Sequence, residues 1–240
     1  METSQMNSRI AVIPARGGSK RLPGKNIRMM EGIPLIGRTI SLLLESNFFD
    51  EVFVTTDNQE IAKVSKEFGA TIPFLRDKNL SDDFTPTQPV ISKFLYELSS
   101  KLAIDPEFCC CIYSSAFMLP KHVFSETFNL LTAKNDCDFV ATILKYSHPI
   151  QRAMTLNKFT NAVTFLNPEN LATRTQDLEE TYFDAGQLYW GRSKAWKEMR
   201  PIFDKTTVGY PLELNSVVDL DSQDDWLKAE ELFKVRNLLQ

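Results

Sequence analysis

The chain has 240 residues, of which 43% are apolar and 24% are charged. This composition is ordinary for a globular protein and excludes disordered, collagen-like and disulfide-scaffold proteins. The 27 basic residues are interspersed among 31 acidic ones, without the basic stripe that nucleic acid would need. The polar start METSQMNSR and the absence of an apolar run near the roughly 18 residues of a membrane span predict a cytoplasmic protein with a small-molecule ligand.

The first two thirds of the chain alternate between short apolar runs and longer segments with helical spacing. In chain order, we predict a strand at 10–13, a helix at 34–45, a strand at 51–56, a helix at 58–68, a strand at 70–74, a helix at 87–102, a strand at 109–113, a helix at 121–132 and a strand at 139–144. Asn58 is expected to cap its helix, and Gly69 fits the left-handed position after it. This alternation favours an α/β fold with a mostly parallel sheet flanked by helices.

The pattern changes after residue 144. Segments from 145 to 184 are short and rich in turns, and we interpret them as an inserted lid or dimerisation lobe within one domain spanning 1–240. A strand is predicted at 187–190 and a strand-like run at 217–220. A last helix at 222–239 would be opened by Ser222 and by Asp225 three residues later.

Three of the four cysteines are consecutive, at Cys109, Cys110 and Cys111. Successive side chains of a strand point to opposite faces, so these thiols cannot converge on one ion. The two histidines, His122 and His148, belong to no metal-binding cluster. We therefore expect buried, reduced cysteines and no zinc site.

The loop after the first strand, PARGGSKRLPGKN, contains three glycines, and five cations lie between residues 16 and 28, namely Arg16, Lys20, Arg21, Lys25 and Arg28. Glycines let a backbone approach an anion closely, and so many cations suit a polyphosphate. Five residues separate Gly18 from Gly24 and Asn26 follows Lys25, so the loop is not a Walker A motif. It also lacks the GxGxxG pattern of dinucleotide folds, although Asp57 mimics their ribose-binding acid. On charge alone, a solvated basic turn is an equal alternative.

The run IPARGGSKRLPGKN resembles the first motif of the CMP-nonulosonate synthetases, the cytidylyltransferases that activate sialic acid and related sugars. The segments VTTDNQEIAKVSKEFGA, PFLRDKNLSDDFTPT and VVDLDSQDDWLKAEEL extend the resemblance along nearly the whole chain. The segments CCCIYSSAF, PIQRA and RTQDLEETYFDAGQLYWG are most similar to the branch that activates pseudaminic acid. The resemblance implies a Rossmann-like nucleotidyltransferase fold, CTP as co-substrate and a homodimer.

The resemblance implies that the first loop holds CTP through Ala15, Arg16, Ser19, Lys25 and Asn26. Arg16 would contact phosphate, Ser19 would offer its hydroxyl, Lys25 would lie beside the triphosphate and Asn26 would contact the ribose. Cations placed where charge develops are what phosphoryl transfer requires of a protein, so Lys25 is the first catalytic candidate and Arg16 the second.

The cytosine would be recognised by Arg76 together with Thr85 or Thr87. Arg76 could instead cover an apolar edge, because long cationic side chains do so routinely.

Asp219 and Asp221 lie two residues apart in VVDLD, so an extended backbone puts both carboxylates on one face. Such a pair can bind Mg²⁺ (or Mn²⁺) together with waters and substrate phosphates. The alternative from the residues alone is that both acids favour the start of the last helix. The metal-binding motif of the family matches these two positions, and Asp221 is the third catalytic candidate.

In TYFDAGQLYWG, polar groups alternate with aromatic ones, as the binding site of a sugar requires. We predict that the acceptor sugar contacts Tyr113, Ser114, Asp184, Gln187 and Tyr189. In the sialic acid branch the position of Tyr113 is usually glutamine, which bears on the choice of sugar. The alternative is that these aromatic side chains belong to the core.

The leading hypothesis is an enzyme that transfers CMP from CTP to the anomeric hydroxyl of pseudaminic acid. The same reaction on sialic or legionaminic acid is the first alternative, and a sugar-1-phosphate nucleotidyltransferase is the second. A nucleotide-sensing protein without turnover is a third, disfavoured by the presence of Lys25, Asp219 and Asp221 together.

Overall fold

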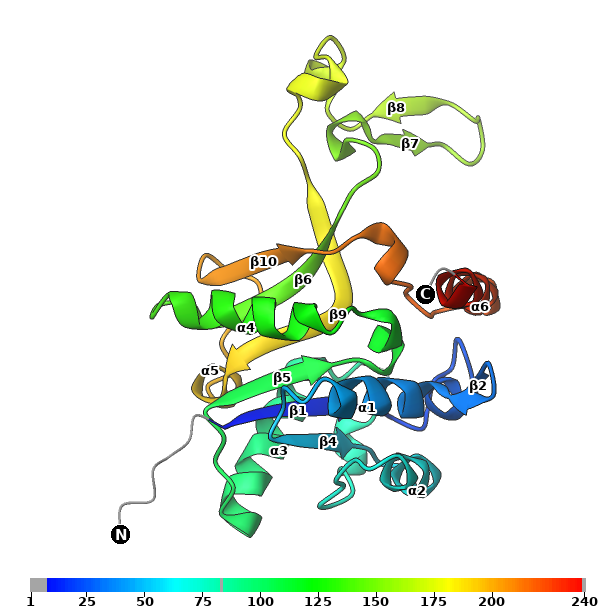
Figure 1. The fold of residues 1–240 in the computed structure, drawn as a ribbon. Helices are drawn as coiled ribbons and strands as arrows, with labels where there is room; N and C mark the ends of the chain where they lie inside the picture. Colours follow the sequence, from blue (N-terminus) through cyan, green and yellow to red (C-terminus); the bar gives the residue numbers. More distant parts are fainter. Residues whose placement is uncertain (1–7, 83, 239–240) are drawn as a thin grey trace.

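The computed structural model describes residues 8–82 and 84–238, and within them six strands form one twisted sheet (Figure 1). Its strand order is β10-β6-β9-β5-β1-β4. The pairs β1 with β4, β1 with β5 and β6 with β10 are parallel, whereas β9 runs antiparallel to both of its neighbours. The sheet strands are β1 (Arg9–Pro14), β4 (Glu51–Thr55), β5 (Phe108–Ile112), β6 (Phe139–Lys145), β9 (Tyr182–Arg192) and β10 (Thr207–Pro211).

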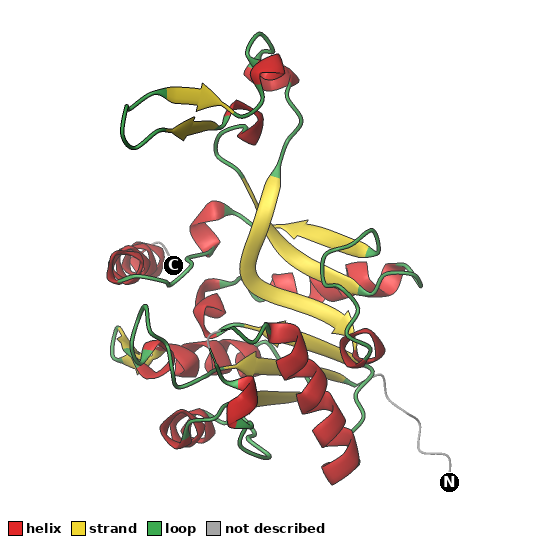
Figure 2. Ribbon diagram, turned by 180° about the vertical axis from the view of Figure 1, so that it is seen from behind, coloured by secondary structure: helices red, strands yellow, loops and turns green. Residues whose placement is uncertain are grey.

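Helices cover both faces of the sheet because its central strands are apolar on both sides. Alternate residues of β1 enter different cores: Ala11 and Ile13 pack on the face that carries α1, α2 and α4, whereas Ile10 and Val12 pack against α3 and α5. Figure 2 shows the long α3 on the side opposite to α1. The helices are α1 (Leu35–Glu45), α2 (Gln59–Glu67), α3 (Thr87–Leu102), α4 (His122–Ala133), α5 (Ser193–Lys197) and α6 (Gln223–Leu238). This architecture confirms the predicted α/β fold.

The consecutive cysteines follow the predicted alternation. Cys110 packs in the core under α1 and α4, while Cys109 and Cys111 pack in the core under α3. All are buried and free, as is Cys137, and burial raises the pKa of each thiol. None of the described helices is long and apolar enough to cross a membrane.

Local signals in the sequence placed several helix ends correctly. The Asn58 side chain accepts the backbone N–H groups of Glu60 and Ile61 at 2.8 and 3.0 Å, and Gly69 has φ of +94°. At the last helix, the Asp225 carboxylate accepts the Ser222 N–H at 2.9 Å, and the Ser222 hydroxyl accepts the Asp225 N–H at 3.2 Å. The predicted end of that helix at residue 239 lies outside the described residues.

Two predicted strands are wrong. In the segment 70–74, Thr71 bridges Phe53 and no strand forms, because Pro73 has no N–H to extend the pairing. The run 217–220 joins no sheet and leads directly into α6 as a loop.

Other strands were missed or placed too short. The edge strand β10 contains a glycine and a proline and is half-exposed, so its apolar pattern is weak. The predicted strand at 187–190 is part of the longer β9. A small hairpin of β2 (Met29–Met30) and β3 (Ile33–Pro34) follows the cationic loop.

The segment between β6 and β9, residues 146–181, extends away from the sheet (Figure 1). We call it the lobe. It contains a hairpin of β7 (Met154–Leu156) and β8 (Val163–Phe165) and three 3₁₀ turns. Several of its apolar side chains are exposed, namely Met154, Leu156, Phe159, Val163, Leu166 and Leu171. The other 3₁₀ turns of the described chain are η1 (Lys25–Ile27), η2 (Lys78–Leu80), η3 (Ser114–Met118) and η7 (Leu214–Ser216).

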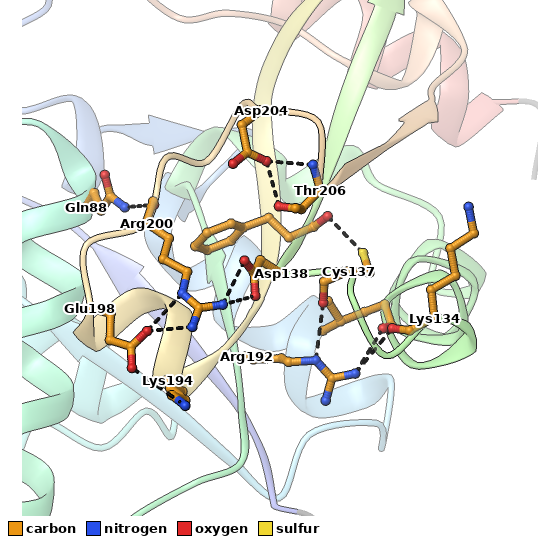
Figure 3. A network of polar contacts seen from close by, with 12 residues as sticks. Gln88, Lys134, Cys137, Asp138, Arg192, Lys194, Glu198, Arg200, Asp204 and Thr206 are labelled. Carbon is orange, nitrogen blue, oxygen red and sulfur yellow. Dashed lines mark hydrogen bonds and ion pairs between the residues drawn. The ribbon is translucent and has the colours of Figure 1, made fainter.

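A polar network joins α3 to the end of α5 (Figure 3). Arg200 donates to both carboxylate oxygens of Asp138, at 2.7 and 2.9 Å, and to Glu198. Its backbone carbonyl accepts the side-chain amide of Gln88, near the start of α3. Gln88 follows Thr87, which reaches the cavity described below, so the network anchors the helix that carries this residue.

Candidate active site

A cavity of about 600 Å³ lies beyond the carboxyl ends of β1 and β5, where parallel sheets usually bind ligands. Its walls contain side chains from nearly every segment singled out in the sequence. The predicted residues that line it are Arg16, Ser19, Lys25, Asn26, Arg76, Thr85, Thr87, Tyr113, Ser114, Asp184, Tyr189, Asp219 and Asp221.

The loop of residues 16–26, the cationic loop, forms one wall of the cavity. Gly24 adopts φ of +66°, a left-handed conformation that lets the chain turn into η1. Asn26 is buried there, and its side-chain amide donates to the Arg16 carbonyl at 2.9 Å. The Ser114 hydroxyl donates to the Asn26 side-chain oxygen at 2.6 Å. Asn26 therefore ties the loop to the end of β5.

Lys25 lies at the foot of this wall beside the carboxylates of Asp219 and Asp221. Its Nζ donates to the Leu220 carbonyl at 3.1 Å. Burial lowers the pKa of Lys25, and the two aspartates act in the opposite direction. A partly buried ammonium interacts more strongly with a phosphate than a fully solvated one does.

Asp219 and Asp221 face the same cavity from the segment before α6. Burial raises the pKa of Asp219, and the like charge of Asp221 raises it further. Arg21, whose side chain is 74% exposed, pairs with Asp221 at 2.5 Å.

No group of three or more potential metal-ligating side chains occurs among the described residues. Two carboxylates fit a magnesium ion whose other ligands are waters and, beside a nucleotide, substrate phosphates. The donor set therefore fits a metal that arrives with a triphosphate.

Arg76 extends the wall that the cationic loop forms. We call the loop and Arg76 together the cationic wall. Arg76 is buried, which lowers its pKa, and it lies 3.9 Å from the Asp57 carboxylate. The same carboxylate accepts the Gly17 N–H at 2.9 Å, and Arg16 donates to the Asp82 carbonyl at 3.0 Å. Asp57 thus holds the loop and Arg76 together.

The opposite wall, the acceptor wall, comes from β5, β9 and the start of α3. The Tyr113 hydroxyl bonds to the Thr87 hydroxyl, and the Tyr189 hydroxyl donates to Asp184 at 2.6 Å. The two tyrosine rings meet edge to face, with centroids 6.0 Å apart. Burial raises the pKa of both phenols, so both remain neutral donors at physiological pH.

Two predicted residues do not line the cavity. Ala15 is fully buried in the core under α1, so it shapes the loop only through its backbone. Gln187 is 1% exposed, and its amide donates to the Ala185 carbonyl at 3.1 Å. Unbroken strand alternation would place Gln187 on the face of Tyr189, but Gln187 lies where the pairing of β9 with β6 shifts register.

Some lining residues were missed. Lys20 and Arg21 were named in the cation cluster of the same loop but were not among the predicted contact residues. Ser115 follows Ser114 in η3, Gly186 lies in the bulge of β9, and Asp82 lies before α3. Nothing in their local pattern predicts a site, because the fold alone brings them to the cavity.

The sequence model of the cytidylyltransferase family matches residues 10–234. The chain belongs to this family. It is 39% identical over 228 residues to the pseudaminic acid cytidylyltransferase of Campylobacter jejuni, covering 95% of this chain and 97% of the relative. It is 30% identical over 236 residues to the CMP-N,N'-diacetyllegionaminic acid synthase of Legionella pneumophila, covering 94% and 96%.

Comparison with solved structures also identifies the fold of the chain. The CTP complex of a CMP:2-keto-3-deoxy-manno-octonic acid synthetase superposes with a TM-score of 0.70 at 15% identity, over 95% of this chain and 99% of that one. The resemblance confirms the predicted Rossmann-like nucleotidyltransferase fold.

Proposed function

We propose that this cytidylyltransferase transfers CMP from CTP to the anomeric hydroxyl of pseudaminic acid. The observation that carries the proposal is that one cavity joins a cationic wall to a wall of hydroxyl, carboxylate and aromatic groups. The first suits a triphosphate and the second a sugar with acetamido and hydroxyl groups. The identity of 39% to the Campylobacter jejuni enzyme supports pseudaminic acid as the acceptor.

In the proposed reaction, the anomeric oxygen of the sugar attacks the α-phosphorus of CTP. A bond forms between this oxygen and the phosphorus, the bond to the bridging oxygen of the β-phosphate breaks, and pyrophosphate leaves with the electron pair. The hydroxyl proton passes to solvent or to a carboxylate of the cavity. Such a displacement asks the protein mainly for alignment and for positive charge near the phosphate oxygens.

The cationic wall supplies that charge. Lys25 and Arg16 would contact the phosphates, and Asn26 and Ser19 would orient the nucleotide. Arg76 with Thr85 or Thr87 would recognise the cytosine. Asp219 and Asp221 would hold Mg²⁺ or Mn²⁺, which when bound neutralises phosphate charge and lowers the pKa of the attacking hydroxyl. Because Arg21 pairs with Asp221 in the free protein, it would have to leave that carboxylate when nucleotide and metal enter.

The acceptor wall would bind the sugar through Tyr113, Ser114, Asp184 and Tyr189. Gln187 is buried and would not contact the sugar itself. Its bond to the Ala185 carbonyl would support the bulge of β9. A site built on buried polar groups rejects analogues that leave those groups unpaired. The 30% identity to the Legionella pneumophila synthase makes legionaminic acid an alternative acceptor, and sialic acid is a second alternative.

The direct test is pyrophosphate release from CTP and Mg²⁺ with pseudaminic, legionaminic and N-acetylneuraminic acids offered separately and in competition. We expect release with pseudaminic acid in strong preference. Preference for another of these sugars would correct the acceptor alone. Release with a sugar 1-phosphate instead would assign a different nucleotidyltransferase, and binding of CTP without any release would assign a sensor.

We further propose that the lobe joins two copies of the chain into a homodimer. Its exposed apolar side chains, among them Leu156, Phe159 at 98% exposure and Val163, would be covered by a second copy. Light scattering should give twice the chain mass, and Phe159→Ser with Leu156→Ser should give single chains. A monomeric natural protein would leave the lobe as a lid.

The free thiols are consistent with the reducing cytoplasm as the proposed location.

A further inference from the structure

The hydrogen-bonding ladder between β6 and β9 is interrupted beside the cavity. Ala141 pairs with Tyr189, but Ile143 pairs with Asp184. An unbroken antiparallel ladder would pair Ile143 with Gln187, so β9 carries three additional residues here. Thr142 alone therefore faces the segment 185–188, and Figure 2 shows that β9 is bent along its length.

The side chain of Thr142 closes this gap. Its hydroxyl donates to the Leu188 carbonyl at 3.1 Å and accepts the Leu188 N–H at 3.1 Å. Thr142 and Leu188 are both fully buried, so water cannot replace these bonds. A hydroxyl suits the position because it both donates and accepts. Loss of the hydroxyl would leave the buried Leu188 N–H without its acceptor and would take one donor from the Leu188 carbonyl.

The bulge that Thr142 closes carries part of the acceptor wall. Asp184 and Gly186 line the cavity from its first half, and the Asp184 carboxylate accepts the Gly186 N–H at 2.9 Å. Gly186 has φ of +60°, which favours glycine at this turn. On the other edge of β9, the Gln187 carbonyl accepts the Tyr113 N–H at 3.0 Å. The bulge thus touches two acceptor candidates, while the cationic wall is built without it.

We propose that Thr142 is a positioning residue for the acceptor sugar. It contacts no substrate and acts through Leu188, fixing the bulge at the point where Asp184 and Tyr113 face the cavity. This inference rests on the proposed function, since it assigns the β9 wall to the sugar. If the inference is right, the shape of the acceptor wall depends on the side chain of Thr142, which belongs to the neighbouring strand β6.

The test compares Thr142→Val, which keeps the shape and removes the hydroxyl, with Thr142→Ser, which keeps the hydroxyl. Michaelis constants for pseudaminic acid and for CTP are measured separately in each variant. We expect Thr142→Val to raise the constant for pseudaminic acid at least about tenfold and that for CTP less than about twofold. Thr142→Ser should restore values near those of the natural protein.

A matched control is Thr127→Val in α4. Thr127 is also fully buried and donates to a helix carbonyl, that of Val123, but it does not line the cavity. This variant should leave both constants unchanged. If Thr142→Val does not fold, Thr142→Cys, whose thiol is a weak donor and acceptor, should show a smaller change in the same direction.

Equal rises in both constants, or no rise for pseudaminic acid in folded variants, would overturn the proposal and make Thr142 a residue of sheet stability alone. These outcomes differ from failure of the proposed function. If the natural protein releases no pyrophosphate with pseudaminic acid, the function fails before any variant is compared.

Discussion

The two walls of the cavity are built in different ways. The cationic wall comes mainly from one continuous loop, residues 16–26, which is joined to the segment before α6 by an exposed ion pair and by the bond from Lys25 to the Leu220 carbonyl. The acceptor wall is assembled from β5, β9 and α3, and its tyrosines are largely buried and bonded to Asp184 and Thr87. From these contacts we expect the first wall to adjust to a flexible triphosphate and the second to hold its shape around a sugar ring.

This difference separates affinity for the nucleotide from selectivity for the sugar. Cations meet phosphates through charge, which tolerates small displacements. The hydroxyls of Tyr113 and Tyr189, which lie largely within the protein, discriminate through directional hydrogen bonds, and these tolerate displacement poorly. Variants of one wall should therefore leave the Michaelis constant for the other substrate nearly unchanged.

The largest expected effect lies where the walls share the reacting phosphate. Asp221→Asn should lower turnover by about three orders of magnitude, because a lost carboxylate removes several kcal/mol of charge stabilisation through the metal. Steady-state kinetics measure it, and the melting temperature should change little. Asp224→Asn, at the start of α6 and away from the cavity lining, is the control. Retained turnover in Asp221→Asn, or full activity in EDTA, would contradict the metal assignment.

A second variant separates catalysis from binding within the cationic wall. Lys25→Ala should lower turnover about a hundredfold with a smaller loss of CTP affinity, because this partly buried ammonium meets charge that grows in the transition state. Arg16→Ala should weaken CTP binding as well. Calorimetry with CTP and single-turnover rates measure the two effects, with the exposed Lys63→Ala as control. A change in CTP affinity alone would make Lys25 a binding residue.

Asp184→Asn tests the acceptor wall. It weakens the acceptor of the Tyr189 hydroxyl, so the Michaelis constant for the sugar should rise about tenfold while that for CTP stays within about twofold. Asp177→Asn, in the lobe, keeps the same chemistry away from the cavity lining. Parallel rises in both constants would mean that the walls do not act separately.

The smallest effect is expected at the exposed pair of Arg21 and Asp221. Arg21→Ala should change the free energy of unfolding by less than about 1 kcal/mol, since solvent screens the pair. It should nevertheless raise the affinity for Mn²⁺ several-fold in the absence of CTP, because Asp221 loses its counter-ion. Titration of Mn²⁺ by electron paramagnetic resonance measures this, with Arg174→Ala in the lobe as control. Unchanged affinity would show that Arg21 does not occupy the carboxylate in solution.

The sequence predicts the cationic wall better than the acceptor wall. Glycines and cations within one loop form a local pattern, and the carboxylates of Asp219 and Asp221 lie two residues apart, so both features are visible without the fold. Asn58 and Ser222 likewise marked helix starts, because caps depend on neighbouring residues only.

The acceptor wall depends on pairings between distant residues. Gln187 was predicted to line the cavity from simple alternation, but it lies in the bulge of β9 and is buried. Gly186 is a local sign of a bulge, but it gives neither the length of the bulge nor the direction of the side chains after it. Thr142 looks like any residue of a buried strand until its partner Leu188 is known. The edge strand β10 was missed for a related reason, since its pairing with β6 compensates for a weak apolar pattern.

The most direct test of the central claim, that one cavity joins CTP to a nine-carbon sugar acid, is phosphorus NMR of a single reaction mixture. The protein, CTP, Mg²⁺ and pseudaminic acid should convert the three CTP resonances into one phosphodiester resonance and one pyrophosphate resonance in equal molar amounts. Omission of the sugar should leave CTP intact. Pyrophosphate formed without the sugar, or CTP unchanged in its presence, would contradict the account.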